Sequence, residues 1–167
     1  EPGADPSKMT FFMPDHNGPC RFGDYNKLHR IIFDRMGFYE AEILTPTNDN
    51  SYAEIAPGKS AKFRLNAWKG IVATDLLKKM VQEKRPYEKV KGSANKLYQF
   101  WLNKVIESIE NGSRTLPKTL ENAGKAFKIL DVEKGNRKPL IAIVGETFMR
   151  DNPYSSSFLV EKLEALG

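Results

Sequence analysis

The sequence has 167 residues, of which 40% are hydrophobic and 28% are charged, with a single cysteine and a formal net charge of +5. This profile is typical of one globular domain and excludes a disordered chain and a disulfide scaffold. No apolar run approaches the roughly 20 residues that span a bilayer. The 26 basic residues are interleaved with 21 acidic ones. This mixed pattern argues against nucleic-acid binding but permits contact with an acidic partner or with phosphates.

The ends of the chain suggest its context. Residues 1–6 lack the basic and apolar regions of a signal peptide, and a free cysteine suits a reducing compartment, so we expect a cytoplasmic protein. The chain begins with Glu1 and stops just after a predicted helix. We therefore expect residues 1–167 to form a single α/β domain, or part of one, within a longer protein.

The first predicted elements form a strand–helix–strand unit. Residues 9–13 are a short apolar run closed by Pro14, which indicates a buried strand. Asp24 is a good N-cap for a helix that carries apolar residues at helical spacing to Met36 and stops at Gly37. Residues 39–44 are the natural second strand. This order predicts one βαβ unit.

The middle of the chain, about 60–132, is predicted to be a helical insertion. One helix runs from about Ser60 to Arg85, a second begins at Ser93 and ends at Asn111, and a third begins at Thr115. The residues expected on their buried faces are Leu65, Trp68, Val72, Leu76 and Met80 in the first helix, Leu97, Trp101, Val105 and Ile109 in the second, and Leu120, Phe127 and Leu130 in the third.

A continuous β-branched run, residues 140–144, is typical of a central parallel strand. A last helix is expected to begin within residues 155–157 and to continue through Leu166. Together these elements predict an α/β fold: a Rossmann-like, three-layer parallel sheet with helices on both faces and the helical insertion in the middle of the chain.

The carboxyl ends of parallel strands share one edge, where ligands of open α/β sheets collect. Three loops would meet there: residues 14–23, 45–59 and 145–154. Their polar candidates are His16, Cys20, Arg21, Ser51, Tyr52, Glu146, Arg150 and Asn152.

Cys20 is the central candidate, because it stands beside Arg21 and just ahead of a predicted helix amino terminus, a setting that favours a thiolate. A thiolate binds metal or acts as a nucleophile, whereas a lone cysteine also often only packs. Gly18 and Gly23 resemble a phosphate cradle, but Asp24 and Tyr25 stand where a P-loop needs Lys followed by Ser or Thr.

The remaining candidates each have a functional and a structural interpretation. Glu146 is either a catalytic base or ligand support, or a solvated turn carboxylate, and Arg150 is either a catalytic group or a surface cation. His29 lies in a predicted helix, where a packing or surface role is expected. Asp75 is expected to cap or pair.

Three motifs resemble the acyl-CoA dehydratase activase-related proteins. They are residues 11–14 with the string Gly18-Pro19-Cys20-Arg21-Phe22-Gly23 and its continuation to residue 26, residues 67–77 with 85–88, and residues 138–146 with Arg150 and Asn152. The resemblance covers nearly the whole chain. Asp24 departs from it, because the family more commonly has Gln there.

The resemblance implies a function in acyl-CoA metabolism of the anaerobic type. In that family, ATP-driven activase modules are joined to regions similar to 2-hydroxyacyl-CoA dehydratases and benzoyl-CoA reductases, which hold an iron-sulfur cluster through cysteines. Cys20 would be one ligand of a [4Fe-4S] cluster, with Arg21, Gly18 and Gly23 around it. Such a cluster takes about four thiolates.

The other ligands would then come from flanking segments or a partner, and the isolated chain would be cluster-free and inactive. Expected partners are other domains of a longer chain, an ATP-dependent activase and acyl-CoA. The alternative is a non-catalytic docking or scaffold domain for the same partners.

Overall fold

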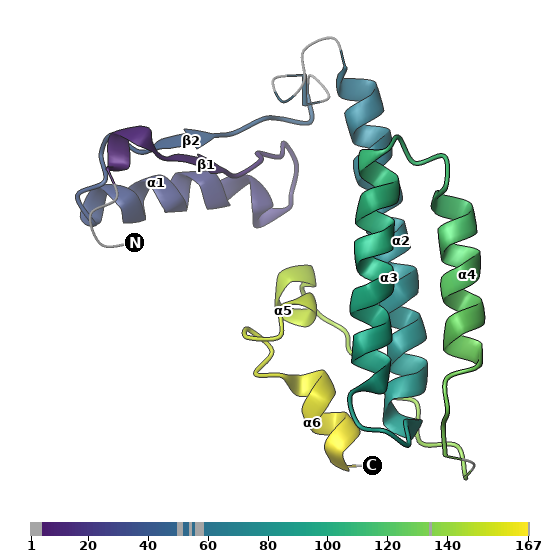
Figure 1. The fold of residues 1–167 in the computed structure, drawn as a ribbon. Coiled ribbons are helices and arrows are strands. Elements are labelled where there is room, and N and C mark those ends of the chain that lie inside the picture. Colours follow the sequence, from purple (N-terminus) through teal and green to yellow (C-terminus); the bar gives the residue numbers. More distant parts are fainter. Residues whose placement is uncertain (1–4, 50–51, 54, 56–58, 134, 167) are drawn as a thin grey trace. The chain divides into compact units, whose positions relative to one another are not determined.

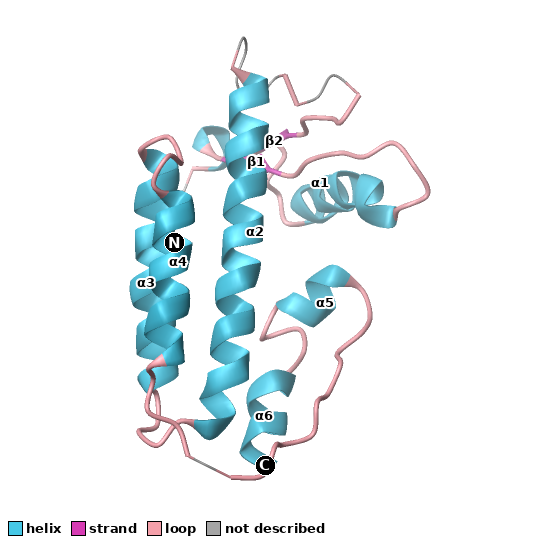
Figure 2. Ribbon diagram, turned by 90° about the vertical axis from the view of Figure 1, so that its right-hand side faces the viewer, coloured by secondary structure: helices cyan, strands magenta, loops and turns pink. Residues whose placement is uncertain are grey.

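The structure is a computed structural model, and it describes residues 5–49, 52–53, 55, 59–133 and 135–166. Helices dominate these residues, and the strands are short (Figure 2). The elements in chain order are η1 Pro6–Lys8, β1 Thr10–Phe12, η2 Arg21–Asp24, α1 Tyr25–Arg35, β2 Glu42–Leu44, α2 Ser60–Lys84, η3 Arg85–Tyr87, α3 Ser93–Glu110, α4 Leu116–Lys128, α5 Thr147–Asp151 and α6 Leu159–Leu166.

The chain divides into two compact units, Glu1–Ala67 and Trp68–Gly167, and the helix α2 spans the boundary between them. No helix within the described part of the chain is long and apolar enough to cross a membrane.

The amino-terminal unit contains the predicted βαβ arrangement, which is confirmed. Strands β1 and β2 pair in parallel with Phe11 opposite Ile43, and α1 connects them and lies along the sheet (Figure 1). Phe33 of α1 contacts Phe11, with ring centroids 4.4 Å apart. The neighbouring sheet residues Phe12 and Leu44 alternate to the opposite side and are exposed.

Arg30 fixes the return of the chain from α1 to β2. Its guanidinium donates to the carbonyl oxygens of Ala41 at 2.5 Å and Phe38 at 2.7 Å, and it also contacts the Asp34 carboxylate at 2.9 Å. These bonds satisfy carbonyl groups just beyond the helix end, where the backbone has no helical partner. The turn after α1 is therefore held by a side chain of the helix itself.

Helices α2, α3 and α4 run side by side and form the main core of the carboxy-terminal unit (Figure 1). The predicted helical middle of the chain is confirmed, and each of the three helices begins within a residue of its predicted start. The predicted buried faces of α3 and α4 are also confirmed, because their apolar residues are buried or packed against the core. The buried core residues are Ala73, Leu77, Val81, Ala94, Val105, Leu116, Ala123 and Phe127.

The predicted buried face of α2 is wrong except at Met80, which is half-buried and packs against the core. Trp68 is 65% exposed, and Leu65, Val72 and Leu76 are exposed as well. The buried residues Ala73, Leu77 and Val81 lie one position further along the chain than the predicted set. Apolar side chains occur on several faces of α2, so the positions of α3 and α4 decide which face is covered.

The predicted third strand, residues 140–144, is absent. The segment has no ladder partner in the described part of the chain, and Leu140 and Val144 are 89% and 86% exposed. The predicted Rossmann-like three-layer sheet with helices on both faces is therefore wrong: the described residues hold a two-stranded sheet and are predominantly helical. A β-branched run predicts extended backbone, but a strand also needs a neighbour whose backbone groups it can bond.

The predicted carboxy-terminal helix is present, but it begins later than predicted. Residues 153–158 form turns, and α6 begins at Leu159, two residues beyond the predicted start. The short helix α5 was not predicted, because five residues are too few to display an apolar period.

Candidate functional site

Cys20 is exposed and immediately precedes η2 and α1. Its backbone is extended, and its carbonyl oxygen accepts a hydrogen bond from the Gly23 amide at 3.3 Å. Arg21, the next residue, is also exposed. The predicted position of a thiol at the turn between β1 and α1 is confirmed, and the sulfur is open to a ligand or a reagent.

Asp15 organises the loop that carries Cys20. Its amide donates to the Pro46 carbonyl oxygen at 3.0 Å, which extends the parallel pairing beyond the strands. Its carboxylate accepts from the His16 amide at 2.7 Å and from the Asn26 side chain at 3.2 Å. One half-buried carboxylate thus connects the end of β1, the loop and the first turn of α1.

Asn17 joins the loop after β1 to the loop after β2. Its amide donates to the Asn48 side chain at 3.4 Å, and its side-chain amide donates to the Asp49 carboxylate. Thr47 forms a parallel β-bridge with Asp15, and the Thr47 carbonyl oxygen accepts a hydrogen bond from the Tyr52 amide at 2.9 Å. The structure therefore brings together two of the three loops that the sequence nominated.

The two loop glycines have different roles. Gly23 is buried, and a Cβ there would overlap the carbonyl oxygen of His16 and approach the Asp15 carboxylate to 3.2 Å. A Cβ on Gly18 would come within 3.0 Å of the His16 imidazole. Close approach of Gly23 to the backbone of the preceding loop allows Cys20 to sit on a compact turn.

The other candidates of this unit are placed as follows. Tyr52 is half-buried with a positive φ of 59°, and Ser51 lies outside the described residues. The ring of His29 stacks on Phe33 at 6.3 Å, which is the packing role expected for it.

The third nominated loop belongs to the carboxy-terminal unit. The Glu146 carboxylate accepts the Met149 amide at 2.9 Å and so caps α5, while the Asn152 side chain accepts the Ser155 amide at 2.9 Å. Both side chains thus stabilise local turns. Arg150 is exposed on α5, and Asp75 is exposed on α2.

Sequence reasoning did not identify Asp15, Asn17, Asn26 and Thr47 as residues that shape the loop. A usable signal was present: Asp and Asn side chains directly after a strand commonly bond to nearby backbone amides. Asn17 bonds to Asn48 and Asp49, 31 and 32 residues away in the sequence, and Asn26 bonds to Asp15, 11 residues away, so no local pattern identifies these pairs.

Among the residues that the structure describes, no cluster of three or more His, Cys, Asp and Glu side chains is arranged to hold a metal ion. Cys20 would therefore need further ligands from outside these residues to hold a cluster. The chain matches no model of a known protein family, no curated protein and no solved structure.

Proposed function

We propose that this chain is a module of an acyl-CoA dehydratase activase-related protein, in which Cys20 supplies one thiolate ligand to a [4Fe-4S] cluster. The module would serve electron transfer or dehydratase-like chemistry on acyl-CoA substrates. The observation that carries the proposal is the exposed thiol in the loop beyond β1, beside the loop that follows the parallel strand β2. Ligands of larger open α/β sheets bind at the carboxyl ends of the strands, and the Cys20 loop follows that end of β1 in this two-stranded sheet.

The loop suits a cluster ligand for two reasons. A thiolate bound to iron leaves net negative charge, and Arg21, the next residue along the chain, supplies a cation that would offset that charge. Gly23 lets the chain turn tightly after Cys20, because a Cβ there would overlap the His16 carbonyl oxygen. Since the sequence holds one cysteine, the other ligands come from another segment or subunit.

The proposal includes a location and partners. Iron-sulfur proteins of this kind work in a reducing compartment, so we place the protein in the cytoplasm. Its partners are an ATP-dependent activase and the domains that supply the remaining thiolates.

Iron analysis of the natural protein, purified anaerobically with its accompanying domains or subunits, tests the ligand role. We expect Cys20→Ala to lose most of its iron and sulfide. The matched control is Lys27→Ala, which removes an exposed cation of the same segment, paired with Asp24 at 3.1 Å, and should keep the iron. Equal iron content in the Cys20→Ala and unmodified proteins would reject the ligand role.

Alkylation of the chain by itself tests the geometry. A thiol that lies open in the loop should react with iodoacetamide in the native protein about as fast as in the urea-unfolded protein. A reaction slowed by several orders of magnitude in the native protein would mean that the sulfur is covered.

A second candidate is a non-catalytic docking domain for the activase partner. It is favoured by the exposed apolar segment 140–144, since monomeric proteins rarely expose contiguous apolar surface without a binding role. This candidate predicts that Cys20→Ala leaves iron content unchanged while Leu140→Ser weakens co-purification of the activase.

A further inference from the structure

A cavity of about 790 Å³ lies within the Trp68–Gly167 unit, between α2, η3, the extended segment 137–143 and the helices α5 and α6. Its volume falls in the range of about 300–1,000 Å³ that is typical of small-molecule sites. None of the residues of the Cys20 loop lines it.

The cavity is apolar along most of its walls. Leu140, Ile141 and Ile143 line it from the extended segment, and Leu163 and Leu166 line it from α6. The extended segment is attached to η3, because the Lys138 amide donates to the Tyr87 hydroxyl at 2.8 Å. The exposed apolar run that fails to form a strand therefore serves as one wall of this cavity.

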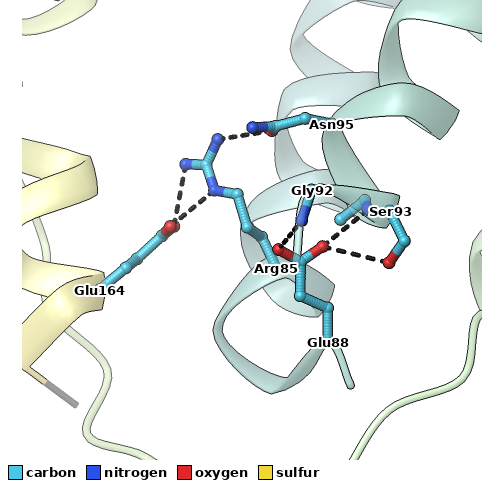
Figure 3. A network of polar contacts seen from close by, with 7 residues as sticks. Arg85, Glu88, Gly92, Ser93, Asn95 and Glu164 are labelled. Atoms are coloured by element: carbon cyan, nitrogen blue, oxygen red, sulfur yellow. Dashed lines mark hydrogen bonds and ion pairs between the residues drawn. The ribbon is translucent and has the colours of Figure 1, made fainter. Parts of the chain in front are cut away.

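The opposite wall, α6, is attached by a two-pronged ion pair (Figure 3). Arg85 donates to the two carboxylate oxygens of Glu164 at 2.6 and 3.0 Å, and a third guanidinium nitrogen donates to Asn95 of α3 at 3.0 Å. The side chains of Arg85 and Glu164 are only 17% and 18% exposed, so water screens the pair weakly. This bidentate geometry holds α6 in one orientation.

The charges that line the cavity do not balance. Its three carboxylates each have a cation: Glu164 pairs with Arg85, and Asp151 and Glu83 lie 3.8 and 4.0 Å from lysines. By contrast, Arg137, Lys138 and Arg150 also line the cavity, and no described carboxylate forms an ion pair with any of them. Lys138 lies over the Tyr87 ring, with its Nζ 5.6 Å from the ring centroid, so Arg137 and Arg150 are the two lining cations for which the described residues show no ion pair or ring contact.

We propose that this cavity binds an anionic amphiphile, an alkyl chain that ends in a carboxylate or a phosphate. The chain lies against Leu140, Ile143 and Leu163, and the head group bonds to the guanidinium group of Arg137 or of Arg150, both of which line the cavity. Guanidinium groups match both head groups through paired hydrogen bonds, and burial of each methylene group favours binding. This inference does not depend on the cluster proposal, and Cys20→Ala should bind the amphiphile unchanged.

The test is a fluorescence titration of the full chain with dansyl-undecanoic acid, followed by displacement with dodecanoate and dodecyl phosphate below their micelle concentrations and with dodecanol below its solubility limit. Either anion should displace the probe, and the better competitor identifies the preferred head group. Dodecanol should compete at least about tenfold less well, because it lacks the charge that the arginines bond. Equal competition by dodecanol, or no binding of the probe, would overturn the proposal.

Two variants separate the charge from the apolar contact. Arg137→Gln combined with Arg150→Gln should weaken dodecanoate binding about tenfold or more and leave dodecanol unchanged. Leu140→Ser should weaken both ligands, and it should fold normally because Leu140 is 89% exposed. Arg114→Gln, an exposed cation that does not line the cavity, is the matched control. Full binding by the double arginine variant would contradict the proposed head-group site.

Discussion

Gly23 shows how one residue determines the geometry of the Cys20 loop. It lies in η2 without a positive φ, so its backbone conformation alone does not require glycine. The requirement is spatial, because a Cβ would overlap the His16 carbonyl oxygen. A backbone oxygen cannot rotate away as a flexible side chain can, so the loop itself would have to move.

We therefore expect Gly23→Ala to lower the free energy of unfolding by about 1–3 kcal/mol, the usual cost of forcing an atom into a packed site. Gly70→Ala is the control, because Gly70 lies within α2 and a Cβ there meets nothing within 4 Å. That change should raise stability by about 0.5–1 kcal/mol, through helix propensity. Urea unfolding of both variants measures the free energy of unfolding. An unchanged free energy in Gly23→Ala would show that the loop backbone shifts to accommodate the Cβ without a cost in stability.

The position of Cys20 at a turn was predictable from the sequence, but its surroundings were not. A cysteine between a strand and a helix was expected to lie at a turn, and it does. Its surroundings were not predictable, since Asp15, Asn17 and Asn26 position the loop through partners on other elements. Polar side chains of this kind have many possible acceptors, and only the folded chain selects one.

At the scale of elements, Glu88 shows how a helix start is stabilised from outside the helix. Its carboxylate accepts the amides of Gly92 and Ala94 at 2.7 and 2.8 Å, where α3 begins (Figure 3). Burial by itself raises the pKa of Glu88. The hydrogen bonds from Ala94, Gly92 and Ser93, with the nearby charge of Arg85, outweigh burial and hold the pKa below its ordinary value of 4.5.

A depressed pKa means that the folded state binds the proton less readily than the unfolded state. The contribution of Glu88 is therefore complete above about pH 4.5 and is lost as the pH falls through the lower folded-state pKa. We expect Glu88→Gln to cost about 1 kcal/mol at neutral pH, as for a lost helix cap. The difference from the unmodified protein should shrink in acid. Denaturant titrations across this pH range measure it.

Glu110→Gln provides the control, because it removes an exposed carboxylate at the other end of the same helix. Its stability difference should stay small at every pH. If Glu88→Gln lowered the free energy of unfolding equally at neutral and acid pH, the stabilisation could not come from the ionised Glu88 carboxylate that caps α3.

Helix α2 shows where element-level prediction stops. Its start and end follow from local signals, including Pro86 just beyond its last turn. The buried positions Leu77 and Val81 and the exposed positions Trp68 and Leu76 are equally apolar in the sequence. The distinction arises from the helices packed against α2, which no window along α2 contains.

At the scale of the whole molecule, the Arg85–Glu164 pair connects residues 79 positions apart and attaches α6 to η3 and α3. Burial lowers the pKa of Arg85, but the hydrogen bond and charge of Glu164 outweigh it and hold the pKa above its ordinary value. Arg85 therefore stays charged at every physiological pH. If Glu164 is removed, that charge is left partly buried without its partner.

We expect Glu164→Gln to lower stability by about 1–3 kcal/mol, less than the cost for a fully buried pair because both side chains keep some exposure. In this variant, amide hydrogen exchange should speed up first in α6, because the Arg85–Glu164 ion pair attaches this helix to η3. Glu107→Gln breaks an exposed pair with Lys104 and should cost at most about 0.5 kcal/mol. Unchanged exchange in α6 would show that apolar packing alone holds this helix.

The sequence by itself determined the parts of this protein whose causes are local. The start of α4 at Leu116 with Pro117 in its first turn, the stop after Arg35 and the parallel βαβ unit all follow from prolines, glycines and short apolar runs. The start of α3 at Ser93 was predicted in its place, but the group that caps it is the Glu88 carboxylate and not the Ser93 side chain. Only the tertiary structure decided which face of α2 is buried and that residues 140–144 line a cavity instead of joining a sheet. The physical reason is that capping and backbone preferences act over a few residues, whereas burial and strand pairing depend on partners far along the chain.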